Sequence, residues 1–245
     1  MISFTAGYFG WLANQMFQYA ATFSLAKHRG VPCTFPKNRP NLYEIFKLSA
    51  YPGFTASQRP YQEPHFHHDP GFWNLPDGTE LSGYFQSEKY FARYADEIRK
   101  EFSFRGMEMI PLISWVSIHV RRGDYLSFPE HHPPLTMEYY REAMARFPGA
   151  RFLVFSDDPG WCLLNFRDAG YNVEISTGRS AAEDMALMAA CDHHIIANSS
   201  FSWWGAWLSR NPEKRVIAPA AWFGPAKQPP QWDTRDLLPE SWERI

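Results

Sequence analysis

Cysteine is scarce in this sequence: the three residues, Cys33, Cys162 and Cys191, lie far apart and are odd in number. They show no C-x-x-C spacing, which argues against both a disulfide framework and a local cysteine metal site. We expect all three to be buried, reduced thiols in a protein of a reducing compartment.

Long apolar runs are also missing. The most apolar segment, residues 185–197, is interrupted by an Asp-His-His triplet and cannot span a bilayer unaided. The first residues contain no basic stretch followed by an apolar one, so no signal peptide is visible. We expect a cytoplasmic protein without a transmembrane segment, with peripheral attachment to the inner membrane as the alternative.

Neither sign of charge dominates, since 24 Lys and Arg residues face 26 Asp and Glu residues and the net charge is -2. A chain that binds nucleic acid through its overall charge would show a strong basic excess, so we expect no nucleic-acid partner. An anionic ligand must therefore meet a local cluster of positive groups. The grouped histidines lack cysteine or carboxylate partners at ligand spacing, which predicts surface or loop histidines and no metal site.

What the sequence does contain is an alternation of short apolar strands and helical segments. Residues 2–6, 14–29 and 31–35 are typical of strand, helix and strand, with Gly7 and Gly10 in the first turn. A further helix is expected at residues 87–102. From residue 115 the alternation is regular, with strands expected at 115–120, 152–155, 172–175, 194–197 and 215–218, and helices at 137–147, 161–169, 182–191 and 202–209. This pattern predicts an α/β fold with a doubly wound parallel sheet.

A first polar cluster follows the strand at 115–120, where ligands of open parallel sheets bind. Because side chains alternate along an extended chain, His119 and Arg121 share one face while Arg122 points elsewhere. A guanidinium holds a diphosphate with paired hydrogen bonds and keeps its charge near neutral pH. The alternative is an arginine in a surface salt bridge. The Gly-Asp that follows makes a sharp turn, which is typical of a functional loop. The diphosphate contact and the surface salt bridge are therefore about equally favoured.

A second cluster, the Ser-Ser-Phe-Ser run at residues 199–202, opens a tryptophan-rich helix. Ser200 or Ser202 can cap this helix, and the same free N–H groups can bind an anion at the positive end of the helix dipole. The three tryptophans that follow are spaced to meet on neighbouring turns, which predicts packing rather than sugar contacts.

A third cluster, Ser156, Asp157 and Asp158, follows the strand at 152–155. Its acids could hold a metal, bond a ribose or cap the next helix. A divalent metal usually needs more ligands than this run supplies, so capping or ribose bonding is favoured. Asp184, near the start of a later helix, could cap that helix or accept N–H bonds from guanine.

These clusters, in this order, resemble the bacterial α-1,2-fucosyltransferase family and its relatives among the α-1,6- and protein O-fucosyltransferases. Residues 10–20, GWLANQMFQYA, are similar to the family's GGLGNQMFQYA opening. The other matching segments are residues 119–125, 155–158, 183–188, 198–208 and 216–223. The resemblance departs from the family at Trp11 and Ala13, where glycine is usual, and this departure bears on the acceptor side.

The resemblance implies an α/β GT-B-type fold, with two Rossmann-like lobes whose parallel sheets face a central cleft. Residues 1–110 would form the N-terminal acceptor-side lobe and residues 111–245 the C-terminal GDP-fucose-binding lobe. It also implies a galactoside α-1,2-fucosyltransferase: inverting transfer of L-fucose from GDP-fucose to a glycan hydroxyl, O2 of a terminal galactose in a surface polysaccharide. No metal or other cofactor would be required.

The expected catalytic residues are Arg121, Asp124 and Asn14. The resemblance places Arg121 on the donor phosphates and Asn14 among the polar residues that face the cleft. Asp124 is the acid nearest to the phosphate strand, and it is a candidate general base or a brace for the arginine turn. The expected substrate-binding residues are His119, Arg121, Ser156, Asp157, Asp184, Ser200, Phe201 and Ser202.

Two other interpretations stay open. Trp11 and Ala13 would suit a GDP-sugar or glycan-binding protein on the same fold whose catalysis is impaired. A transferase of the same fold that uses another nucleotide sugar is the second alternative. The relative affinities for GDP, UDP and ADP would separate these cases.

Overall fold

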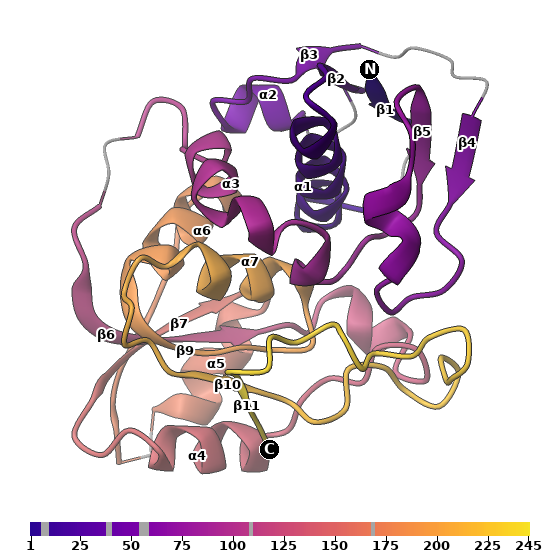
Figure 1. Cartoon of the computed structure of the whole chain (residues 1–245). Coiled ribbons are helices and arrows are strands. Elements are labelled where there is room, and N and C mark those ends of the chain that lie inside the picture. The colour runs from indigo at the N-terminus through magenta and orange to yellow at the C-terminus, as the bar shows by residue number, and fades with distance from the viewer. Residues whose placement is uncertain (6–9, 38–40, 54–58, 108–109, 168–169) are drawn as a thin grey trace. The chain divides into compact units, whose positions relative to one another are not determined.

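The computed structural model describes residues 1–5, 10–37, 41–53, 59–107, 110–167 and 170–245 (Figure 1). The chain divides into two compact units, Met1–Met107 with Pro229–Pro239, and Glu108–Gln228 with Glu240–Ile245. The sequence-based division after residue 110 differs at Pro229–Pro239, which packs with the first unit. Two contacts explain this placement: the Trp232 ring lies 5.4 Å from that of Phe66, and Lys89 pairs with Asp236 at 2.6 Å.

The first unit contains a five-stranded parallel sheet in the order β3-β2-β1-β5-β4. Its strands are β1 (Ile2–Phe4), β2 (Cys33–Phe35), β3 (Tyr51–Pro52), β4 (Arg59–Gln62) and β5 (Thr79–Ser82). The strands predicted near residues 2–6 and 31–35 are confirmed, whereas β3 and β4 lie in a stretch without periodicity and were not predicted. Gly7 lies outside the described residues.

Helix α1 (Leu12–Arg29) follows β1 and confirms the helix predicted at residues 14–29. Its buried face carries Met16, Phe17 and Leu25 into the core of the unit. The helix ends at Gly30, which adopts a left-handed φ of 66° that glycine tolerates without steric cost. Shorter elements complete the unit: α2 (Leu42–Ile45) and the 3-10 helix η1 (Pro70–Asn74).

The single helix predicted at residues 87–102 is wrong. The structure divides this stretch into η2 (Glu88–Tyr90), η3 (Ala92–Tyr94) and α3 (Ala95–Glu101). Phe91 interrupts the helix because its backbone adopts φ -148° and ψ -5° while its ring is fully buried. The aromatic residues therefore face the core from a broken segment rather than from one regular helix.

The second unit contains a six-stranded parallel sheet in the order β11-β10-β9-β6-β7-β8. Its strands are β6 (Ile113–Val120), β7 (Arg151–Ser156), β8 (Asn172–Ile175), β9 (Cys191–Ile195), β10 (Val216–Ala218) and β11 (Glu243–Arg244). The five strands predicted in this part of the chain are confirmed. The sixth, β11, has two residues and adds to the edge of the sheet beside β10.

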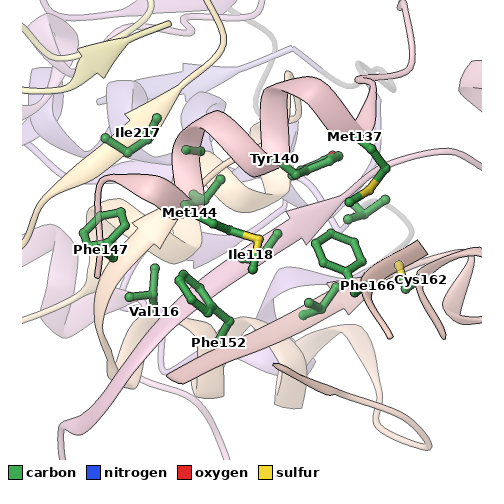
Figure 2. Close-up of a cluster of buried hydrophobic side chains, with 14 residues drawn as sticks. Val116, Ile118, Met137, Tyr140, Met144, Phe147, Phe152, Cys162, Phe166 and Ile217 are labelled. Atoms are coloured by element: carbon green, nitrogen blue, oxygen red, sulfur yellow. The ribbon is translucent and has the colours of Figure 1, made fainter. Parts of the chain in front are cut away.

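Helices cover both faces of the second sheet. They are α4 (Met137–Ala145), α5 (Pro159–Phe166), α6 (Ala181–Ala190) and α7 (Ser200–Leu208). Figure 2 shows side chains of α4, among them Tyr140 and Met144, packed against Val116 and Ile118 of β6. The alternate strand residues, such as Phe155, pack with α6 on the other face. The predicted doubly wound α/β fold is therefore confirmed.

The three cysteines are buried and form no disulfide, as predicted. Burial raises the pKa of Cys33 and Cys191 to about 12, which keeps these thiols protonated near neutral pH. The prediction of surface histidines is wrong for His194, which is fully buried and shares a 2.8 Å hydrogen bond with Ser117. Within the described ranges, no helix combines the length and apolar character needed to cross a membrane.

Candidate active site

His119 lies near the carboxyl end of β6, with its ring 5.4 Å from the ring of Phe201. Only 5% of the residue is exposed, and its Nδ1 is buried without a hydrogen-bond partner in the structure. Burial, together with the charge of Arg121, lowers the pKa of His119 to about 3. His119 is therefore neutral at working pH and can act as a hydrogen-bonding group but not as a cation.

Arg121 follows the end of β6 and is held by two carboxylates. Its guanidinium pairs with Asp124 at 2.7 Å and with Asp157 at 3.0 Å. The group also lies over the ring of Tyr125, 5.5 Å from its centroid. About 30% of the side chain is exposed, so the guanidinium is oriented by its neighbours yet open to a ligand.

Arg122 contacts a different set of residues, as the alternation of side chains predicts. Its Nε pairs with Asp158 at 3.1 Å, and its guanidinium lies 4.4 Å from the ring centroid of Trp161. Its backbone N–H donates to Asp157 at 2.9 Å. The two arginines thus have different neighbours. Arg122 contacts residues at the start of α5, and Arg121 lies at the end of β6.

The turn at residues 156–158 is built by its own polar side chains. Ser156 Oγ accepts the N–H of Asp158 at 2.9 Å, and Asp158 caps α5 by accepting the N–H of Trp161 at 3.0 Å. Capping, one of the favoured interpretations of this cluster, is what Asp158 does. Asp157 instead braces both arginines, and a Cβ at Gly123 would lie 2.7 Å from its Oδ2. A glycine at residue 123 is therefore needed for this close approach.

Asp184 does not cap α6. Ser180 is the N-cap, and it forms a capping box with Glu183. Asp184 accepts a hydrogen bond from Ser176 Oγ at 2.7 Å, and Arg179 donates to the same hydroxyl at 3.0 Å. Burial raises the pKa of Asp184, while the Ser176 hydrogen bond and Arg179 oppose the shift. The carboxylate is thus a half-buried acceptor held at the start of α6.

The cap predicted for α7 is wrong. Ser199, rather than Ser200 or Ser202, is the N-cap residue, and its side chain makes no capping hydrogen bond. Ser202 is buried, and its hydroxyl donates to the carbonyl of Ser199 at 3.1 Å. The tryptophans of α7 pack in the core as predicted, with Trp203 and Trp204 fully buried.

The sequence did not reveal a cluster that braces the strand tip. The ring of His132 stacks on that of Tyr125 at 4.9 Å, and Lys227 Nζ lies 3.0 Å from His132 Nε2. Burial and the charge of Lys227 lower the pKa of His132 to about 4, so His132 is neutral. Tyr125 donates its hydroxyl to the carbonyl of Asn198 at 2.9 Å. The place of Asn198 directly after a strand is the one sequence signal that could have pointed to this cluster.

Asn14 belongs to the first unit, where it lies in the first turn of α1. Its Oδ1 accepts a hydrogen bond from Gln86 Nε2 at 2.9 Å. Gln86 is a further residue that the sequence did not single out. The two amides are 72 positions apart, so no local pattern connects them.

The second unit therefore gathers two guanidinium groups and three carboxylates where β6 and β7 end, together with the first turn of α7. Such an arrangement can bind an anion such as a phosphate. The oxygens of the anion can replace a carboxylate on Arg121, and the N-terminus of α7 adds oriented N–H groups. In the part of the chain that the structure describes, no three His, Cys, Asp or Glu side chains gather as metal ligands.

The two parallel α/β units define a fold of the GT-B class of glycosyltransferases. The structure is similar to that of NodZ α-1,6-fucosyltransferase soaked with GDP-fucose, at a TM-score of 0.54 and 16% identity over 89% of this chain and 94% of the other. It is also similar to that of POFUT1 in complex with GDP-fucose, at a TM-score of 0.50 and 11% identity over 88% and 96% of the two chains. At these identities the likeness bears on the fold alone.

The chain belongs to glycosyl transferase family 11, whose model matches residues 70–228. An α-1,2-colitosyltransferase of Escherichia coli is 34% identical over 70% of this chain and 64% of its own length. A galactoside α-(1,2)-fucosyltransferase 2 of Pongo pygmaeus is 29% identical over 82% of this chain and 67% of its own length. The chain thus spans a little under two thirds of the length of the first of these relatives.

Proposed function

We propose that this chain transfers L-fucose from GDP-fucose to O2 of a terminal galactose, forming an α-1,2 linkage in a surface polysaccharide. Membership of family 11 supports this activity, as do the galactoside α-(1,2)-fucosyltransferases among its relatives. The observation that carries the proposal is the partly exposed guanidinium of Arg121, held at the tip of β6 by Asp124 and Asp157.

In the proposed reaction the acceptor hydroxyl attacks the anomeric carbon of fucose and displaces GDP in one step, which inverts that carbon. The bond between fucose and the β-phosphate breaks, and its electron pair stays on the phosphate oxygen. Arg121 and the N–H groups of the first turn of α7 would stabilise this developing charge. Such groups accelerate the reaction because their interaction is strongest in the transition state.

Asp124 has two proposed roles. Its carboxylate is exposed and so accessible to an acceptor, and as a general base it would take the proton of the acceptor hydroxyl. It also accepts a hydrogen bond from Arg121 at 2.7 Å, which suits a brace that orients the guanidinium. The contact with Arg121 directly supports the bracing role. A transition state with strong oxocarbenium character would need only a weak base.

The remaining donor contacts are assigned by position. Asp184 would accept N–H bonds from guanine, and its link to Ser176 and Arg179 holds the carboxylate for that purpose. Ser156 ends the neighbouring strand β7 and Asp157 follows it to pair with Arg121, so a ribose or phosphate oxygen would bind here. His119 and Phe201, whose rings are in contact, would form a neutral wall of the donor site.

Transfer of colitose is the second candidate function. It is favoured by the α-1,2-colitosyltransferase, which is 34% identical to this chain, whereas the galactoside α-(1,2)-fucosyltransferase of Pongo pygmaeus is 29% identical. Competition between GDP-fucose and the GDP derivative of colitose for the same galactoside would decide between the two donors. If kcat/KM is greater with the colitose donor, colitose replaces fucose as the proposed transferred sugar, and the site assignments stay the same.

The proposal is tested by incubation of the chain with GDP-fucose and a panel of galactosides, followed by mass spectrometry. The expected product is a galactoside that gains one deoxyhexose, while the matched 2-deoxygalactoside gains none. Equal transfer in the presence of EDTA would support the prediction that no metal takes part. A chain that binds GDP but transfers nothing to any galactoside would instead support an impaired GDP-sugar or glycan-binding protein.

A further inference from the structure

The carboxyl edge of the first sheet also gathers polar side chains. Glu63 follows β4 directly, and Gln86 follows β5 after three intervening residues. Asn14 lies in the first turn of α1, which follows β1, the central strand of this sheet. Since ligands of parallel sheets bind where the strands end, this edge is the counterpart of the edge that carries Arg121 in the second unit.

Two amides meet at this edge in a fixed geometry. Gln86 is 6% exposed and donates from Nε2 to Asn14 Oδ1 at 2.9 Å. The Asn14 amide folds over Gly10, where an added Cβ would lie 2.0 Å from Nδ2. Gly10 also has a φ of 82°, so its backbone and its lack of a side chain both fit this approach. The orientation of the Asn14 amide is therefore set from two sides.

The turn that carries Gln86 is strained. Phe85 has a φ of 53°, the only positive value for a residue other than glycine among those the structure describes. A bulky residue pays roughly 1–3 kcal/mol for such a conformation, which persists only where the surroundings enforce it. Here Glu63 enforces it, because its carboxylate accepts the N–H of Tyr84 at 2.7 Å and that of Phe85 at 3.0 Å. Gln86, which donates to Asn14, is the next residue of this turn.

Trp11 adds an aromatic surface to the same turn of α1. It is 71% exposed, which is unusual for the largest apolar side chain, and it occupies the N-cap without a side-chain capping bond. Most of the indole surface is therefore open to solvent at this position. Trp11 lies next to Asn14 at the start of α1, because its carbonyl accepts the backbone N–H of Asn14 at 3.1 Å.

We propose that Trp11, Asn14 and Gln86 form the subsite for a pyranose ring of the acceptor glycan, with Glu63 as the positioning residue of the turn. This inference rests on the proposed transferase function. An indole face stacks on the C–H face of a neutral sugar, while amides exchange hydrogen bonds with its hydroxyl groups. The combination of a flat exposed ring and oriented amides suits a neutral sugar, in contrast to the charged edge of the second unit.

Trp11→Ala tests the stacking surface. The acceptor KM should rise about tenfold, the size expected for one lost aromatic contact, while the affinity for GDP stays unchanged. Trp11→Phe should restore most of the acceptor KM because it keeps a flat ring. Tyr51→Ala removes a 65% exposed ring from β3 of the same sheet and should leave both values unchanged.

Glu63 and Gln86 are tested by the same pair of measurements. Gln86→Leu should raise the acceptor KM without changing GDP affinity, because it removes the hydrogen bond that orients Asn14. Glu63→Leu should do the same, and Glu63→Gln should recover part of the loss since it keeps one acceptor oxygen for the turn. A loss of GDP affinity that accompanies the rise in KM would instead indicate a general structural role.

The outcomes separate this inference from the proposed function. If the unmodified chain neither binds GDP nor transfers fucose, the proposed function fails. If it does both and Trp11→Ala leaves the acceptor KM within twofold, the subsite is wrong and the function stands. If Trp11→Ala lowers binding to anionic phospholipid vesicles but not acceptor KM, the indole serves a membrane surface and the subsite is again wrong.

Discussion

The two parallel sheets carry opposite chemistry at their carboxyl edges. In the second unit the edge holds Arg121 and Arg122 among aspartates, joined by ion pairs of 2.7 to 3.1 Å. In the first unit the edge holds an amide pair, Asn14 and Gln86, and an exposed indole at Trp11. One α/β scaffold thus offers a charged edge in one unit and a largely neutral edge in the other.

The two edges differ in the way that the two substrates of the proposed transferase differ. A diphosphate leaving group carries charge that grows in the transition state, so its site needs oriented cations and N–H groups. A neutral sugar needs flat apolar surface and hydrogen-bonding groups instead. The charged edge of the second unit has the groups that the proposed donor site needs, and the edge of the first unit has those that suit a neutral sugar.

The largest effect should come from Arg121→Ala. Fucose transfer should fall on the order of a hundred- to thousandfold, because the developing phosphate charge loses its oriented partner. Arg141→Ala, which removes an exposed arginine from α4, is the matched control and should change transfer less than twofold. Both variants should unfold at the same temperature as the parent, and near-normal transfer by Arg121→Ala would refute the site.

The neutral edge should be sensitive to crowding at Gly83. Its φ of 153° matches the 155° of Gly53, but an added Cβ at Gly83 would lie 2.4 Å from Cβ of Glu63, whereas Gly53 has no atom within 4 Å. Gly83→Ala should therefore destabilise the protein by about 1–3 kcal/mol more than Gly53→Ala. Urea denaturation measures both, and equal losses would show that Glu63 does not pack tightly against this turn.

The two edges should respond to pH in opposite directions. In the second unit burial lowers the pKa of His119 to about 3 and that of His132 to about 4. As pH falls below about 6.5 the unfolded histidines take up protons first, so stability is lost. In the first unit burial raises the pKa of Glu63 from 4.5 to about 7. The folded protein therefore binds this proton more tightly than the unfolded chain, and stability is lost as pH rises from 4.5 to 7.

Variants sharpen this contrast in urea denaturation between pH 4.5 and 7. His132→Phe keeps the ring stacked on Tyr125 and should make the rise of stability with pH shallower. Glu63→Gln should make that rise steeper, because it removes the opposing group. If both variants keep the slope of the parent protein, the difference between the edges does not extend to their titration.

The smallest effect should come from the helix cap at the charged edge. Asp158→Ala removes the hydrogen bond to the N–H of Trp161 and should cost roughly 1 kcal/mol of unfolding free energy. Thr136→Ala changes the N-cap of α4, which makes no side-chain capping bond, and should cost less. Denaturant midpoints compare the two, and an equal loss would mean that the Asp158 cap adds nothing.

The sequence predicted the elements whose patterns are local. The apolar periodicity of residues 14–29 indicated α1, and the alternation after residue 115 indicated the strands and helices of the second unit. The polar runs at the ends of β6 and β7 pointed to one edge of the sheet, because parallel strands end together. These inferences needed only neighbouring residues and the general geometry of α/β folds.

The rest depends on contacts between distant residues. Strands β3 and β4 are held by pairing with β2 and β5, and the intervening sequence has no strand periodicity of its own. The broken segment at residues 88–101 reflects the burial of Phe91 rather than helix propensity. The Asn14–Gln86 bond joins positions 72 apart, and the His132–Lys227 contact joins positions 95 apart. Helix boundaries predicted from sequence are also uncertain by a residue or two, and the N-cap of α7 is Ser199 rather than Ser200 or Ser202.

The most direct test is titration calorimetry of GDP and guanosine into the parent chain and Arg121→Ala. The variant should bind GDP at least about tenfold more weakly, since a charge-assisted phosphate contact is lost, while guanosine affinity should stay the same. An unchanged GDP affinity, or an equal loss for guanosine, would contradict a diphosphate held by the guanidinium at the tip of β6.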